Sequence, residues 1–193
     1  ITWKTTYLHV YNSKLTMHTL MNQFRSTKKG NDYVIYPTIN SFSCSQIHNQ
    51  KRQNVVYFGR MVAAKNVHLL IKKFKKSKYK DIYRLILAGD YLDKLVQNEI
   101  NNLTNNDNVT FLGSYSDLNY LKSRLDDIGC DSGYFISWNE HEPFGLVYQE
   151  AIELNLLPIF PSQIGFTEVL DKRLLDQISF NSLDRALSVI FEN

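Results

Sequence analysis

Two glutamates frame a short turn in the last third of the chain and could bind one ligand between them. Glu142 and Glu150 are separated by seven residues, and the sequence Pro-Phe-Gly follows the first of them. Proline suits the first turn of a helix, so we expect a helix to open there and to leave the amides of Phe144, Gly145 and Leu146 unpaired. Free amides at a helix N-terminus attract phosphate, and a carboxylate about two turns further along can accept hydrogen bonds from a diol. The pattern therefore predicts two carboxylates around one phosphorylated ligand.

Three loops that follow predicted strands carry glycines, and one of them also carries two cations. Gly59, Arg60 and Lys65 combine a close backbone approach with two positive charges that suit a diphosphate. Gly89 and Gly113 each end a further strand and leave room for a base or a ribose to pass the backbone. We expect these loops at the same edge of one sheet as the glutamate turn, which favours a single shared site.

The chain alternates short β-rich runs with amphipathic segments. Alternating and continuous apolar runs predict strands, and stripes with the helical period predict helices between them. This order predicts an α/β fold with a Rossmann-like, doubly wound parallel sheet, whose ligands bind beyond the carboxyl ends of the strands. The predicted strands are residues 33–36, 55–58, 84–88, 109–112, 134–137, 157–160 and, more weakly, 178–180. The predicted helices cover about residues 15–24, 67–74 after a possible Asn66 cap, 92–103, 118–125, 144–155 and 183–191.

The composition indicates a globular chain of modest size. Its 193 residues and 44% hydrophobic content fit one or one and a half domains with an ordinary core. The formal net charge of +3 is too small to indicate a nucleic-acid partner. Cys44 and Cys130 lie far apart and show neither a metal-ligand spacing nor a disulfide framework. With no signal peptide and no membrane-spanning run in the sequence, we expect a cytoplasmic protein.

A lysine-rich segment, residues 72–80, leaves two interpretations open. Its lysines are interleaved with Ile71 and Phe74, so the segment could form a basic amphipathic face that meets anionic lipid. A solvated helix face would show the same pattern. The expected location is therefore the cytoplasm, with contact at a membrane surface as an alternative.

Over roughly residues 33–180, the chain resembles the C-terminal donor-binding domain of the family 4 retaining glycosyltransferases, which have the GT-B fold. It departs from the family pattern at Tyr91 and at residues 155–158, where glycine is usual. The resemblance rests on five motifs: Gly59-Arg60 to Lys65-Asn66, Ala88-Gly89-Asp90, Phe111-Leu-Gly113, Glu142-Pro-Phe-Gly145 with Glu150-Ala151, and Gly165-Phe-Thr-Glu168-Val.

The resemblance implies roles for several residues of these motifs. The donor would be a nucleotide diphosphate sugar, with UDP expected first and GDP or ADP as alternatives. The family uses no metal, and transfer takes place on the front face, where the leaving phosphate takes the acceptor proton. The catalytic residues would be Glu142 at the donor sugar and Arg60 and Lys65 at the diphosphate. The other donor contacts would be Glu150 at the ribose, the amides of Phe144, Gly145 and Leu146 at the distal phosphate, Tyr115 at the base, and Gly59.

The resemblance also implies that the site is one half of a larger enzyme. Residues 1–50 would be the tail of a truncated N-terminal acceptor domain plus a linker, and residues 51–193 the nucleotide-sugar-binding domain. The acceptor could be a glycan, a lipid-linked molecule or a protein, and we expect this fragment alone to transfer nothing. The alternative is a non-catalytic nucleotide-binding or scaffolding subunit that docks on a separate acceptor-binding partner.

Three further residues have open roles. His141 lies next to the glutamate turn and could act as a general base, because histidine titrates near neutral pH. Asp90 could end a strand, cap a helix or contact the ligand. Glu168 could cap the helix that Gly165 precedes or approach the donor.

Overall fold

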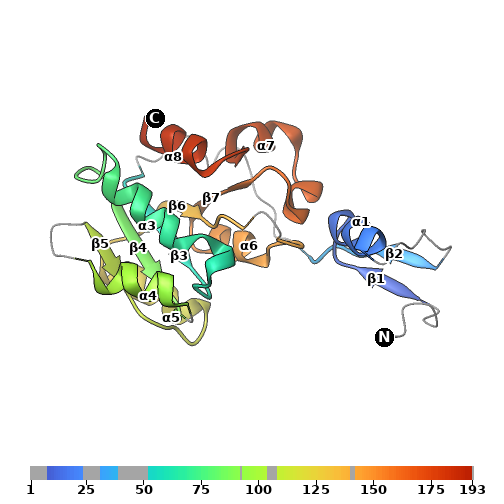
Figure 1. Cartoon of the computed structure of the whole chain (residues 1–193), viewed down its shortest axis with the longest axis horizontal. Helices are drawn as coiled ribbons and strands as arrows, with labels where there is room; N and C mark the ends of the chain where they lie inside the picture. Colours follow the sequence, from blue (N-terminus) through green and yellow to red (C-terminus); the bar gives the residue numbers. More distant parts are fainter. Residues whose placement is uncertain are drawn as a thin grey trace.

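The computed structural model describes residues 8–23, 31–38, 52–91, 93–103, 108–139 and 142–192. Its main body is built on a sheet of six strands, all parallel (Figure 1). In spatial order the strands are β5 (Val109–Phe111), β4 (Arg84–Ala88), β3 (Asn54–Phe58), β6 (Gly133–Ile136), β7 (Leu156–Pro161) and β8 (Ser179–Phe180).

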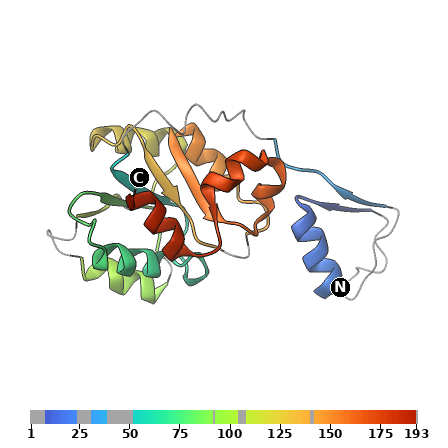
Figure 2. The same ribbon diagram turned by 90° about the horizontal axis from the view of Figure 1, so that it is seen from above.

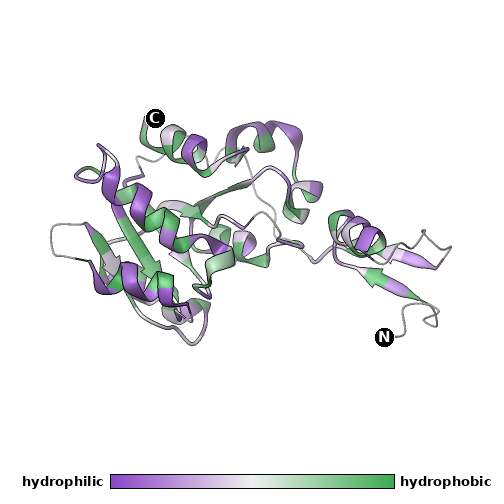
Figure 3. Cartoon of the chain, viewed as in Figure 1, coloured by the Kyte–Doolittle hydropathy of each residue, from purple (hydrophilic) through white to green (hydrophobic). Residues whose placement is uncertain are grey.

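Helices cover both faces of this sheet (Figure 2). On α3 the apolar residues Val67, Leu70, Ile71 and Phe74 are buried against the sheet, whereas its lysines face outward, as the helical period predicts (Figure 3). The fold is therefore the doubly wound α/β arrangement expected from the sequence. One face carries α3 (Val67–Lys76), α4 (Lys94–Asn101) and α8 (Leu183–Glu192), and the other carries α5 (Leu118–Asp127) and α6 (Leu146–Glu153).

The centre of the core lies on the middle strands. Residues 55–58 of β3 and 85–88 of β4 are buried throughout, because a parallel strand covered on both faces has no side that meets water. Aromatic rings then extend the core from β3 toward α6. The Phe58 and Phe135 rings are 4.5 Å apart between centroids, and Phe135 packs edge-on against Tyr148 at 5.9 Å.

A second, two-stranded parallel sheet stands at the N-terminal end of the chain (Figure 1). It consists of β1 (His9–Tyr11) and β2 (Asp32–Val34), with α1 (Lys14–Gln23) between them in the sequence. We call residues 8–38 the front unit. Residues 39–51, on both sides of the predicted domain boundary at residue 50, lie outside the described residues, so that boundary stays a prediction.

Most predicted elements are present, with three differences. The sequence patterns do not predict β1 or α7 (Lys172–Ile178), because β1 buries only Tyr11 and α7 buries only Leu174 and Ile178, which is too few apolar positions to show a period. The 3-10 helices η1 (Ala63–Lys65) and η2 (Gly165–Val169) are equally short. Helix α6 begins two residues later than predicted, since Gly145 has a φ of 93° and takes the N-cap position.

The backbone at Gly89 packs closely against the backbone at Gly59, and only glycine fits at this contact. Its φ is +128°, and a Cβ built there would lie 2.1 Å from the carbonyl oxygen of Gly59. The space beside Gly89 is therefore filled by protein and leaves no passage for a ligand, contrary to the prediction. Gly113 differs, because a Cβ there would meet nothing within 4 Å.

We predict that Gly89→Ala destabilises the protein by more than about 3 kcal/mol, since both the backbone conformation and the Gly59 carbonyl oppose a side chain. Gly129→Ala is the matched control. Gly129 also has a positive φ, but its Cβ would lie in open space, so the loss should be about 1–2 kcal/mol. Urea unfolding measures both values, and equal losses would contradict the close approach.

Candidate functional site

The candidate site lies where the order of the strands reverses. From β3 the chain moves outward through β4 to β5, and from β6 it moves the opposite way through β7 to β8. The loops that follow β3 and β6 therefore diverge, and α/β sheets bind ligands in the crevice that forms at such a point. The sequence-predicted residues Gly59, Arg60 and Lys65 follow β3, whereas Glu142 follows β6.

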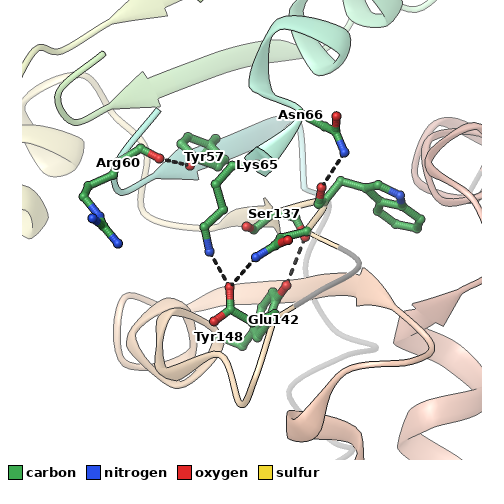
Figure 4. A network of polar contacts seen from close by, with 9 residues as sticks. Tyr57, Arg60, Lys65, Asn66, Ser137, Glu142 and Tyr148 are labelled. Atoms are coloured by element: carbon green, nitrogen blue, oxygen red, sulfur yellow. Dashed lines mark hydrogen bonds and ion pairs between the residues drawn. The ribbon is translucent and has the colours of Figure 1, made fainter. Parts of the chain in front are cut away.

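An ion pair joins these two loops. The Lys65 ammonium donates to Oε2 of Glu142, and Asn139 Nδ2 donates to the same oxygen at 3.1 Å (Figure 4). The two side chains of the pair are only 22% and 15% exposed. The fold thus brings together two residues that lie far apart in the sequence, and it adds Asn139, which sequence analysis missed.

A side-chain hydrogen bond of Asn66 links the two loops. Its φ is 54°, and its side-chain amide donates to the carbonyl oxygen of Trp138 at 3.0 Å (Figure 4). Asn66 stands at the N-cap position of α3, but its side chain makes no capping bond there. Asn66 therefore occupies the predicted cap position but does not cap α3 with its side chain. That side chain bridges the loops that carry Lys65 and Glu142.

The turn after Glu142 leads into α6 through a strained glycine. A Cβ on Gly145 would lie 2.5 Å from the ring of Tyr148, so no other residue fits this conformation. In the described part of the chain, the amides of Phe144, Gly145 and Leu146 have no intramolecular acceptor. These amides stand at the positive end of an eight-residue helix, which attracts negative charge.

Two buried tyrosines donate hydrogen bonds to the backbone of the loops. The Tyr57 hydroxyl donates to the carbonyl oxygen of Arg60 at 2.8 Å, and the Tyr148 hydroxyl donates to that of Ser137 at 3.0 Å. Burial raises the pKa of both phenols, and the negative charge of Glu142 adds to the effect. Both hydroxyls therefore stay neutral and keep donating.

Arg60 does not join the ion pair. Its side chain is exposed, and none of the ion pairs among the described residues includes it. Figure 4 shows its guanidinium apart from Glu142. Within the described ranges no carboxylate pairs with this cation, so it is available to an anion from solution.

Tyr115 and Glu150 lie near each other on the α6 side of the sheet edge. The pKa of Tyr115 is raised by burial and then by the negative charges of Glu150 and Asp90. Burial also raises the pKa of Glu150, with a smaller contribution from Glu153. The Tyr115 ring packs edge-on against Phe58, with centroids 6.4 Å apart. Two residues predicted to contact a nucleoside thus share one region.

A cavity of about 300 Å³ opens beside the ion pair. Its walls include Lys65, Glu142 and residues 143–147, which were predicted as site residues or adjoin them. Asn12 and Pro37 from the front unit complete the lining. Sequence analysis missed these two, because no local pattern shows that the front unit meets the β6 loop.

From the sequence alone, Glu168 and His141 have open roles. The Glu168 carboxylate accepts hydrogen bonds from the front unit and does not line the cavity. It therefore does not cap the helix that begins at Gly165, whereas its approach to a donor stays a prediction. His141, the candidate general base, lies outside the described residues.

Metal ligands and membrane spans are both missing from the described ranges. No three His, Cys, Asp or Glu side chains in these ranges are grouped so that they could hold a metal ion. No helix that the structure describes has the length and apolar character needed to cross a membrane.

Comparison with known proteins identifies the family. No curated protein sequence matches the chain significantly. The family model for glycosyl transferases group 1 matches residues 41–174, which is more than half of the chain. The chain belongs to this family.

Solved structures share the fold of this glycosyltransferase domain. HepE from Anabaena, solved with UDP-glucose, is 21% identical with a TM-score of 0.62, and the match covers 94% of this chain and 52% of HepE. TarM from S. aureus is 19% identical with a TM-score of 0.65, over 97% of this chain and 36% of TarM. WaaG, a glycosyltransferase involved in lipopolysaccharide biosynthesis, is 14% identical with a TM-score of 0.60, over 95% and 52%.

These likenesses confirm the predicted architecture, an α/β domain corresponding to one half of a GT-B glycosyltransferase. The chain spans about half the length of HepE and of WaaG. At identities this low, the comparison concerns the fold and leaves the individual site residues as predictions.

A double-mutant cycle should reveal the ion pair of this glycosyltransferase domain. Lys65→Met and Glu142→Gln should each lower the free energy of unfolding by about 1–3 kcal/mol, because each removes the charged partner of a largely buried ionic group. The double variant should lose less than the sum of the two, with an interaction energy of about 1–2 kcal/mol. Urea unfolding of the four proteins gives this value, and strictly additive losses would show that the pair contributes nothing.

Proposed function

We propose that this chain is the donor-binding half of a family 4 retaining glycosyltransferase, which transfers a sugar from a nucleotide diphosphate sugar. The observation that carries the proposal is the Lys65–Glu142 pair at the switch point, beside the open N-terminus of α6. A cation and free amides suit a diphosphate, and a carboxylate suits sugar hydroxyls.

In this proposal Glu142, Arg60 and Lys65 are the catalytic residues. As the bond between the anomeric carbon and the phosphate oxygen breaks, negative charge grows on the leaving phosphate, and the two cations and the α6 amides stabilise it. Glu142 orients the sugar by accepting from its hydroxyls. The acceptor oxygen bonds to the anomeric carbon on the same face and gives its proton to the leaving phosphate, which retains the configuration. The positive charge comes from protein groups, so the proposed step needs no metal.

Glu150 and Tyr115 are proposed to hold the nucleoside. An ionised carboxylate on α6 can accept two hydrogen bonds from a ribose diol, and a half-buried phenol ring beside Phe58 can contact a base. Gly59 and Gly113 leave open space beside their backbones, which suits a ligand that passes close to the chain. UDP is the first choice of nucleotide because HepE was solved with UDP and with UDP-glucose, and GDP and ADP are the alternatives.

The front unit supports the proposal that an acceptor-binding half completes the site. Leu8, Val10, Tyr33 and Ile35 are each more than half exposed, and alternation along the strands places them on one face of the small sheet. A two-stranded sheet needs packing on its apolar face to be stable. We propose that an acceptor-binding domain, on the same polypeptide or in a partner subunit, covers this face and binds a glycan, a lipid-linked molecule or a protein acceptor.

The lysine-rich helix face is proposed to be solvated. On α3, Lys72 pairs with Glu99 at 3.2 Å, and Lys73 pairs with Asp184 of α8. These pairs neutralise part of the charge that an anionic membrane would attract. A cytoplasmic location without membrane contact through α3 is therefore favoured over the alternative.

Calorimetric titration with UDP, GDP and ADP, without added metal, tests the proposal. We expect one nucleotide to bind, and Glu150→Ala to weaken its binding by about 1–3 kcal/mol through a lost charge-assisted hydrogen bond, roughly 5- to 150-fold. Glu153→Ala is the control, because Glu153 lies about one turn further along α6 and is also exposed. Equal losses in both variants would remove Glu150 from the site. A folded protein that binds none of the three would favour the scaffolding subunit.

Arg60→Ala should separate phosphate contacts from nucleoside contacts. Because the guanidinium is proposed to meet the diphosphate, the variant should weaken binding of the nucleoside diphosphate by about 1–3 kcal/mol and leave binding of the bare nucleoside nearly unchanged. Titration of wild type and variant with both ligands gives the comparison. The same loss for both ligands would exclude a phosphate contact.

A further inference from the structure

We propose that Glu168 and Ser13 are positioning residues that clasp the front unit to the turn carrying Glu142, so that the seating of the front unit sets the geometry of the nucleotide site. The part of this inference that concerns the nucleotide rests on the proposed function. The clasp itself rests on contacts between residues more than a hundred positions apart in the sequence.

Glu168 fastens the front unit at two places. Its Oε2 accepts from the amide of Lys14 at 2.8 Å, and its Oε1 accepts from the amide of Leu15 at 2.8 Å. These are the first two amides of α1, which no residue within the helix can satisfy. The hydroxyl of Tyr36, just beyond β2, donates to Oε2 at 2.9 Å. One carboxylate from the body therefore binds both the start of α1 and the segment that follows β2.

Ser13 connects the front unit to the turn that carries Glu142. Its side chain is fully buried, and its hydroxyl donates to the carbonyl oxygen of Pro143 at 2.6 Å. The same hydroxyl oxygen accepts from the amide of Thr16 at 3.0 Å, so it also caps α1. Pro143 lies between Glu142 and the free amides of α6. The N-terminus of α1 thus holds the backbone segment that carries Glu142 and the amides of residues 144–146, the two groups predicted to bind the nucleotide sugar.

Gly165 allows the three segments to meet. A Cβ at this position would lie 2.0 Å from the carbonyl oxygen of Pro143 and 2.8 Å from Cβ of Ser13. Gly165 opens η2, the short helix that also carries Glu168. With a larger residue here, the clasp and the turn could not approach each other.

Aromatic rings make a second connection between the front unit and the turn. Tyr36 packs against Phe144 with centroids 6.5 Å apart, and Phe144 packs edge-on against Phe166 at 5.9 Å. Phe144 is almost completely buried between these neighbours. The front unit therefore contacts the turn both through the Pro143 carbonyl and through the Phe144 ring, and a displaced front unit would move both.

Residue-resolved amide hydrogen exchange tests the clasp on the whole chain without ligand. In Glu168→Gln, the amides of Lys14 and Leu15 should exchange at least about tenfold faster, because a neutral amide oxygen cannot replace a carboxylate with three donors. The amides of Glu142 and Tyr148, which donate to the carbonyl oxygens of Asn139 and Gly145 on either side of the turn, should also exchange faster in Glu168→Gln and in Ser13→Ala. Unchanged exchange at Lys14 and Leu15 would overturn the clasp.

Two matched controls remove the same kind of helix cap inside the body. Asp93 accepts from the amide of Leu95 at the start of α4, and Ser182 accepts from that of Arg185 at the start of α8. Asp93→Ala and Ser182→Ala should lower the melting temperature as the clasp variants do, but leave exchange at the amides of Glu142 and Tyr148 unchanged. Faster exchange there in the controls would mean that general stability, and no specific clasp, governs the turn.

Nucleotide affinity then tests the positioning role. Measured well below the melting temperature, Glu168→Gln and Ser13→Ala should each weaken UDP binding by about three- to tenfold, whereas the two controls should not. Unchanged affinity despite faster exchange in the turn would overturn the positioning role. If wild type binds no UDP, GDP or ADP, the proposed function fails, and exchange at the amides of Glu142 and Tyr148 alone decides whether the clasp holds the turn.

Discussion

Strands β3 and β6 lie side by side, and the chain leaves them in opposite directions across the sheet. Their loops therefore cannot pack along each other as consecutive loops do, and polar side chains fill the gap between them. Lys65 reaches across to Glu142, and Asn66 reaches across to the Trp138 carbonyl. The carboxylate, the cation and the start of α6 owe their relative positions to this one feature of the strand order.

The elements of the body can be predicted from sequence because their burial is regular. Continuous apolar runs mark β3 and β4, and the stripe on α3 marks its buried face. The ends of elements are harder to predict, since they depend on single dihedral angles such as the positive φ of Gly145. No local sequence pattern reveals the order of the strands in the sheet. The pairing of Lys65 with Glu142 can therefore be expected only from a resemblance or from the fold.

Contacts between distant segments were the least predictable part of the site. Glu168 follows a glycine in a family motif, and that context suggests either a helix cap or a ligand. It is a cap, but for a helix more than a hundred residues earlier in the chain. Gly89 and Gly113 look alike in sequence, each at the end of a strand, yet one touches a neighbouring carbonyl and the other faces open space. The glycine residue type indicates a positive φ at both positions. Only the fold shows whether another backbone segment or open space lies beside each glycine.

The pairing of Lys65 with Glu142 has a consequence for ligand selectivity. An anion that takes the ammonium away from the carboxylate leaves Glu142 largely buried and without its counter-ion, which is costly. Inorganic phosphate or pyrophosphate brings negative charge for Lys65 but only a P–OH or two as hydrogen-bond donors for Glu142, and no sugar hydroxyls. A glycosyl diphosphate brings both, since its hydroxyls can satisfy the carboxylate while its phosphates satisfy the ammonium. The ion pair would then act as an internal competitor that common cellular anions displace poorly and an intact sugar donor displaces well.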